Sequence, residues 1–238
     1  MQKRRTTLFR FGIIAVLTVG GITTANATLI DRGNGMVYDT DQNLTWLQDA
    51  NYAQSSGDDA DGIMTWVEAV AWADNLVYEG YSDWRLPAMV DTGTLGCNYS
   101  YNGTDCGYNV ATTTSELAYL YEIILTNTPY LDTSGNPAPG WNFTPNNSAD
   151  GVTFDNLQSD DYWLGIEYAP DTADAWYFST REGLQFSYPK SYELYAWAVR
   201  SGDVPEPGVL LLLSFGVLGM IGARWRFRQP LPAAIQSP

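Results

Sequence analysis

Two apolar segments lie at the ends of the chain, and they decide how much of it can fold into a water-soluble domain. Residues 1–10 carry four Lys or Arg side chains, and an apolar run over residues 11–22 follows them. Ala25-Asn26-Ala27 then supplies the small residues of a signal-peptidase cleavage site. The apolar run is shorter than the roughly 20 residues that a membrane span needs. Residues 1–27 are therefore interpreted as a signal peptide, removed by signal peptidase, rather than as an N-terminal anchor.

The second apolar segment, near the C-terminus, has different flanking sequences. Pro205-Glu206-Pro207 comes first, a mostly apolar stretch over about residues 208–223 follows, and Arg224, Arg226 and Arg228 come next. Positive residues after an apolar segment stay on the cytoplasmic side, so the Pro-Glu-Pro element is expected to face outward. Residues 204–228 resemble the PEP-CTERM sorting signals that exosortases recognise in many Gram-negative bacteria. The resemblance implies cleavage near Pro205-Glu206-Pro207 after a transient stay in the inner membrane, with residues 229–238 as a short cytoplasmic tail. A plain single-span anchor is the alternative.

Residues 28–203 remain for the folded part, which is enough for one domain with its own core. They contain five Lys or Arg against 26 Asp or Glu, a formal charge of −21. Such a surface repels nucleic acids and polyanionic sugars, because phosphate contacts require Lys and Arg. It suits a neutral polysaccharide, a cationic partner or a divalent metal, and it equally fits the ordinary solvated surface of an exported protein.

The only two cysteines, Cys97 and Cys106, lie in a stretch rich in Gly, Asn and Tyr. An even pair in an exported protein indicates a disulfide. Two thiols in a chain that contains no histidine are a poor zinc site. A disulfide across so short a loop is expected to stabilise the fold by about 2–3 kcal/mol.

Hydrophobic periodicity predicts two helices and several strands, an α+β arrangement. Capping boxes at Thr65/Glu68 and Thr113/Glu116 begin the two helices, and the first is expected to run to about Tyr78. Strands are predicted over residues 36–38, 44–47, 162–165, 175–179, 184–188 and 194–200, with a hairpin turn at 180–183. Residues 48–62 and 129–151 are rich in turn formers and are predicted to be loops.

Three blocks of the domain resemble the family named for the C-terminal domain of the Legionella collagen-like protein. The blocks are residues 35–46, residues 66–87 with 115–117, and the aromatic strands that close at Ala198-Val199-Arg200. Members resemble C-type-lectin-like folds, which implies two helices packed on a mainly antiparallel sheet with long loops, used for binding rather than for chemistry. The namesake binds sulfated glycosaminoglycans, a ligand that this acidic surface disfavours.

The most specific part of the resemblance ends in Trp84, Arg85, Leu86 and Pro87, which are interpreted as a structural signature. These four residues are called the signature corner, and Trp84 and Leu86 are expected to anchor it in the core. Arg85 is one of the five cations in the domain, so it is expected to form a partly buried pair with an acid, either Asp83 or a loop residue.

The absence of histidine from the chain excludes Ser-His-Asp and Cys-His catalytic arrangements. No spacing of carboxylates singles out a pair for glycoside hydrolysis, although the many acids leave an acidic-residue hydrolase as a further alternative. We therefore expect a protein without enzymatic activity.

One acidic stretch has a calcium interpretation. Asp59, Asp61 and Glu68 fit ligand positions of an EF-hand-type loop, but Gly57 stands where the first carboxylate belongs. An acidic loop before a capped helix accounts for the same residues without a metal. Calcium stays open on this pattern, and no other cofactor is expected.

Aromatic side chains in the loops are the candidate ligand-binding residues, because rings flanked by amides stack on carbohydrate. They are Tyr99, Tyr101 and Tyr108 near the cysteines, and Trp141 and Phe143 in the long loop. The alternative is that these rings pack down and pin the loops, especially at Trp141. The sequence thus predicts a cell-surface or extracellular-matrix protein of a Gram-negative bacterium that binds exopolysaccharide or another surface partner. A structural matrix or biofilm protein without a small ligand is the alternative.

Overall fold

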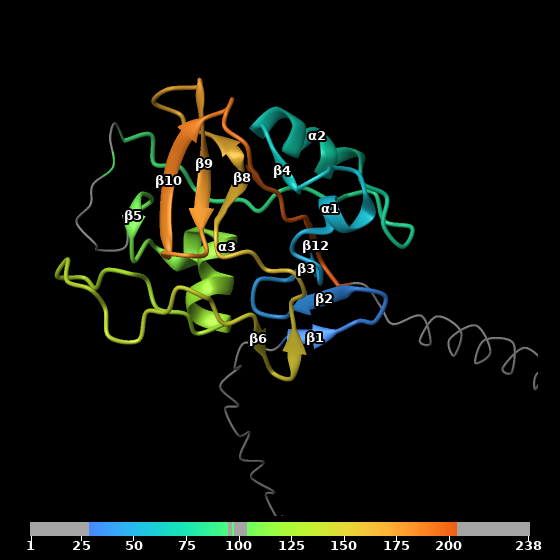
Figure 1. Ribbon diagram of the computed structural model, residues 1–238, viewed down its shortest axis with the longest axis horizontal. Helices are drawn as coiled ribbons and strands as arrows, with labels where there is room; N and C mark the ends of the chain where they lie inside the picture. The colour runs from blue at the N-terminus through green and yellow to red at the C-terminus, as the bar shows by residue number, and fades with distance from the viewer. Residues whose placement is uncertain (1–28, 95–96, 98–103, 204–238) are drawn as a thin grey trace, which may run out of the picture.

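The computed structural model describes residues 29–94, residue 97 and residues 104–203 (Figure 1). The predicted signal peptide, the sorting segment with its span over 208–223, the cytoplasmic tail, Tyr99 and Tyr101 all lie outside these residues. Within the described ranges, none of the helices has the length and apolar character that crossing a membrane requires.

A four-stranded antiparallel sheet holds both ends of the described domain. It consists of β1 (Leu29–Asp31), β2 (Met36–Asp39), β3 (Leu44–Leu47) and β12 (Val199–Ser201), in the order β1-β2-β3-β12. The predicted hairpin of β2 and β3 is confirmed. Its turn is held by the buried Asp39, whose Oδ1 accepts the backbone N–H groups of Asp41 and Gln42 at 2.9 and 3.1 Å.

The second sheet has six strands in the order β4-β11-β8-β9-β10-β5. They are β4 (Ile63–Met64), β11 (Leu194–Tyr195), β8 (Asp161–Glu167), β9 (Asp174–Ser179), β10 (Leu184–Pro189) and β5 (Gly107–Tyr108). Neighbouring strands are antiparallel except for β11 and β8. The strands predicted at 162–165, 175–179 and 184–188 are confirmed.

The single strand predicted over residues 194–200 is wrong. The chain leaves the six-stranded sheet after β11 and joins the four-stranded sheet as β12. Trp197 anchors this crossing, because its ring is buried and its Nε1 donates to the Leu47 carbonyl at 2.8 Å. The apolar run therefore serves two sheets.

Helices cover opposite faces of the six-stranded sheet. Along β9 the side chains alternate: Tyr177 packs in one core cluster with Ala69 and Ala73 of α2 (Trp66–Asn75). Phe178 faces the other way and meets Tyr121 with ring centroids 5.3 Å apart. Tyr121 lies in η2 (Leu120–Ile124), a π-helical continuation of α3 (Glu116–Tyr119). The predicted α+β class is confirmed.

The short remaining elements are α1 (Tyr52–Ser56), the 3-10 turn η1 (Thr112–Thr114) and the hairpin of β6 (Ser148–Ala149) and β7 (Val152–Thr153). Helix α1 interrupts the stretch 48–62 that was predicted to be a loop. The predicted Cys97–Cys106 disulfide is present, and it joins Cys97 to the residue just before β5.

The boundaries of both predicted helices need correction. The capping box of Thr65 and Glu68 is confirmed, but α2 ends at Asn75, because Leu76 turns extended with ψ at 125°. The second capping box is wrong. Ser115, not Thr113, caps α3 by accepting the Ala118 N–H at 3.4 Å.

The signature corner is buried as expected, with Trp84 and Leu86 2% and 3% exposed. Arg85 makes two bonds of 2.7 Å to the carboxylate of Glu116, which explains why Glu116 is unavailable as a capping residue. The suggested pair of Arg85 with Asp83 is wrong.

Asp83 instead accepts from Arg200 of β12 at 2.7 and 2.9 Å. The Arg200 guanidinium also lies over the Tyr81 ring, 4.3 Å from its centroid. The corner thus joins α3 to the last strand, and its cation pairs across the fold rather than within its own segment.

Candidate ligand-binding groove

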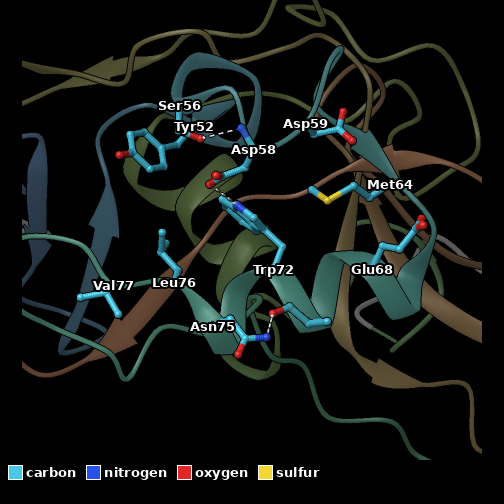
Figure 2. Close-up of a pocket in the computed structure, with 11 residues that line it drawn as sticks. Tyr52, Ser56, Asp58, Asp59, Met64, Glu68, Trp72, Asn75, Leu76 and Val77 are labelled. Carbon is cyan, nitrogen blue, oxygen red and sulfur yellow. Dashed lines mark hydrogen bonds between the residues drawn. The ribbon is translucent and has the colours of Figure 1, made fainter.

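An open groove of about 730 Å³ lies between α1, the loop that follows it, β4 and α2 (Figure 2). Apolar and polar side chains share its lining: Tyr52, Ser56, Asp58, Asp59, Met64, Glu68, Ala71, Trp72, Asn75, Leu76 and Val77. Its volume falls in the range of small-molecule sites, roughly 300–1,000 Å³.

The loop between α1 and β4 is folded tightly by its own polar groups. Helix α1 ends at Gly57, which has φ at 82°. Asp59 Oδ1 then accepts the backbone N–H groups of Asp61 and Gly62 at 3.1 and 2.7 Å. Gly62 also has φ at 82°, and a Cβ there would come within 1.9 Å of Asn51 Oδ1. Only glycine therefore allows the loop to close over α1 in this form.

Two half-buried aromatic rings form the sides of the groove. The side chain of Trp72 projects from α2 into the groove, and the indole Nε1 donates to Asp58 Oδ2 at 3.3 Å (Figure 2). Tyr52 packs edge-on against Tyr78 at 5.0 Å, and Tyr78 in turn meets Trp84 of the signature corner at 6.1 Å. The corner therefore supports one wall of the groove without lining it.

Three carboxylates line the groove: Asp58, Asp59 and Glu68. The hydroxyl of Thr65 donates to Glu68 and lowers its pKa. For Asp59, burial raises the pKa, but the N–H donors of Asp61 and Gly62 together lower it below its usual value. Both groups are therefore anionic at neutral pH, and no Lys or Arg belongs to the lining.

The residues predicted for calcium are only partly brought together. Asp59 and Glu68 line the groove, while Asp61 is not part of the lining. In the part of the chain with described coordinates, no three His, Cys, Asp or Glu side chains converge as a metal site.

The predicted loop aromatics that fall within the described residues gather elsewhere, around the turn between β9 and β10. Trp141 Nε1 donates to the Arg181 carbonyl at 2.9 Å, and Tyr108 donates to Glu182 at 3.2 Å. Both rings meet Tyr130, with the centroids of Trp141 and Tyr108 at 4.9 Å and 6.3 Å from that of Tyr130. These two rings pack against the turn and pin their loops to it.

Phe143 differs from these two rings. It is 57% exposed, and only its backbone carbonyl is tied down, by the Ser159 hydroxyl. It offers an exposed apolar contact, whereas the groove combines rings and polar groups in one lining and is therefore the better-built site.

Sequence reasoning missed Tyr52, Asp58 and Trp72 as site residues. Trp72 carried a usable signal, because it lies beside the core face that Ala69 and Ala73 define on α2 and stays half-buried. A large aromatic at the edge of the apolar face of an amphipathic helix is a candidate contact residue. Tyr52 and Asp58 carried no such signal.

The lining offers several groups that can contact a ligand. Ser56, the one hydroxyl of the lining outside the tyrosine, donates to the Ala53 carbonyl at 3.2 Å. The chain holds no histidine to activate it. The other groups of the lining are aromatic rings, carboxylate acceptors and the amide of Asn75, which are common in the polar and apolar linings of ligand sites.

Comparison with known proteins identifies both parts of the chain. The model of the Lcl C-terminal domain matches residues 35–200, and that of the PEP-CTERM protein-sorting motif matches residues 203–228. No curated protein and no solved structure matches the chain. The sorting motif marks the protein for export and for processing by an exosortase. The chain belongs to the Lcl C-terminal domain family.

Proposed function

We propose that the domain is a polysaccharide-binding module, displayed at the cell surface or in the extracellular matrix of a Gram-negative bacterium after exosortase processing. The groove between α1 and α2 is the observation that carries this proposal. We further propose a C-type-lectin-like fold, because both ends of the domain lie in one sheet and long irregular segments join the helices to the second sheet.

The groove has the chemistry that sugar rings require. The C–H faces of a pyranose stack on aromatic rings, and Trp72 and Tyr52 offer such rings in a half-buried, preformed position. Hydroxyl groups need acceptors and donors beside those rings. Asp58, Glu68 and Asn75 supply them.

Trp72 is fixed before any ligand arrives. Its Nε1 is engaged with Asp58, and α2 is held on the sheet through Trp66, whose Nε1 donates to the Leu164 carbonyl at 2.8 Å. A ring that is already ordered loses little conformational entropy on binding. This preorganisation favours binding of a polysaccharide, because each sugar ring makes only a few strong contacts and leaves little free energy to offset a loss of entropy in the protein.

Substitution of Trp72 tests the proposal directly. With the full-length chain in detergent and the polysaccharide of the producing cells, we expect Trp72→Ala to weaken binding about tenfold, because the stacking face is lost. Trp72→Phe, which keeps a ring, is expected to retain most of the affinity. Phe143→Ala is the matched control outside the groove and is expected to bind like the wild type.

The same experiment separates this proposal from a purely structural role. Saturable retention that depends on Trp72 supports a binding module. Equal retention of all four proteins, or self-association without any polysaccharide, contradicts it.

A further inference from the structure

The charge of the groove is not balanced by the protein itself. Its lining holds three carboxylates and no cation. Among the described residues, no ion pair involves Asp58, Asp59 or Glu68. The groove therefore presents uncompensated negative charge to whatever enters it.

The five cations of the domain are all engaged with other acids. The pairs are Arg32–Asp203, Arg85–Glu116, Arg181–Glu182, Lys190–Glu167 and Arg200–Asp83. Two of these cations also lie over aromatic rings outside the groove, Lys190 over Trp66 and Arg200 over Tyr81. No internal counter-charge is therefore available, and a complementary charge has to come from the ligand.

The positions of the charges and the rings constrain the ligand further. Figure 2 shows Asp58 beside the Trp72 ring, and Asp59 and Glu68 at the other end of the groove near Met64. Negative charge beside the aromatic ring and again near Met64 suits an extended molecule that carries repeated positive charge. A bare metal ion would use the carboxylates alone, and they do not converge as a metal site within the described chain.

We infer that the groove binds a cationic amino-sugar polymer, one whose rings carry free rather than acetylated amino groups. Each protonated amine donates hydrogen bonds to a carboxylate and is attracted to the face of Trp72. The ring behind the amine stacks on the same aromatic surface. Acetylation removes the positive charge and leaves only the stacking, whereas an acidic sugar adds repulsion. This inference rests on the proposed function and names its ligand class.

A comparison of three oligomers by calorimetry with the full-length chain in detergent tests it. The probes are a hexamer of glucosamine, a hexamer of N-acetylglucosamine and hexalysine. We expect the glucosamine hexamer to bind about tenfold more tightly than the acetylated hexamer at low salt, and the difference to shrink as salt screens the charges.

Variants that neutralise carboxylates of the groove test whether these groups cause the preference for the free amine. Asp58→Asn with Glu68→Gln keeps the oxygen acceptors for Trp72 and Thr65, and we expect it to reduce the preference for the free amine to about threefold or less. Asp171→Asn with Glu193→Gln removes the same charge from exposed residues outside the groove lining. This control is expected to keep the full preference.

The possible failures are distinguishable. Equal binding of the two hexamers, both lost in Trp72→Ala, overturns the amino-sugar inference and leaves polysaccharide binding intact. Hexalysine that binds as tightly as the glucosamine hexamer also overturns it, because the groove then selects charge alone. Absence of binding by either hexamer and by the producer's polysaccharide contradicts both proposals.

Discussion

Glu122 shows how strongly a single residue of this fold depends on its surroundings. It lies in the π-helical turn η2, and its Oε1 is buried with no hydrogen-bond partner in the described structure. Burial raises the pKa of this carboxyl to about 7. The folded protein therefore holds Glu122 protonated under conditions in which the unfolded chain has released the proton.

This residue predicts a specific pH dependence of stability. Between about pH 4.5 and 7 the unfolded state binds fewer protons at this site, so rising pH favours unfolding, by up to about 3 kcal/mol. Glu122→Gln cannot ionise, and we expect its free energy of unfolding to change less over this range. Urea denaturation at pH 5 and pH 8 measures the difference, with the exposed Glu193→Gln as control. Parallel pH profiles for wild type and Glu122→Gln would refute the assignment.

At the scale of elements, the link between α1 and β4 sets the shape of the groove, and two glycines allow a matched test. Gly57 and Gly62 both have φ at 82°, but only at Gly62 would a Cβ collide, with Asn51; at Gly57 nothing lies within 4 Å. We expect Gly57→Ala to destabilise by about 1 kcal/mol and Gly62→Ala by about 3 kcal/mol, because the second adds a steric clash to the same strain. Thermal unfolding measures both. Equal losses would show that the contact with Asn51 does not hold the loop.

The elements that sequence reasoning predicted correctly depend on local signals. The capping box at Thr65 and the apolar, aromatic run of β9 involve neighbours a few residues apart, so they are visible in the chain. The wrong predictions arise where a residue distant in the sequence determines the local structure. Ser115 caps α3 because Glu116 is drawn to Arg85, 31 residues away. Residues 194–199 form an unbroken apolar run before Arg200, and only the position of the two sheets divides this segment into β11 and β12.

The groove was predictable to a lesser extent. The spacing of Asp59 and Glu68 drew attention to the loop, although for a calcium site. Asp58 meets Trp72, and Tyr52 shares the lining with them, because Gly62 lets the loop close against Asn51. Hydrophobic periodicity does not predict this contact. Among the loop aromatics predicted as ligand contacts, Tyr108 and Trp141 are packed against the turn that follows β9, and this packing depends on residues distant in the sequence.

At the scale of the whole molecule, the sorting motif and the domain that carries the groove are joined in one short chain. The last described residue, Asp203, forms an ion pair with Arg32, next to β1, and the sorting motif begins at this same position. The folded domain therefore ends where the sorting motif begins. Its strongly acidic surface, with all five cations paired, leaves the groove as an aromatic and anionic site on an exported module.

Hydrogen–deuterium exchange of the full-length chain, with and without the saturating polysaccharide of the producing cells, tests the central claim most directly. Backbone amides exchange more slowly where a ligand holds the structure closed. We predict new protection in residues 52–77, which form the groove, and little change around residues 130–143. Protection confined to residues 104–108 and 130–143, or no protection anywhere in the domain, would contradict the assignment of the groove as the binding site.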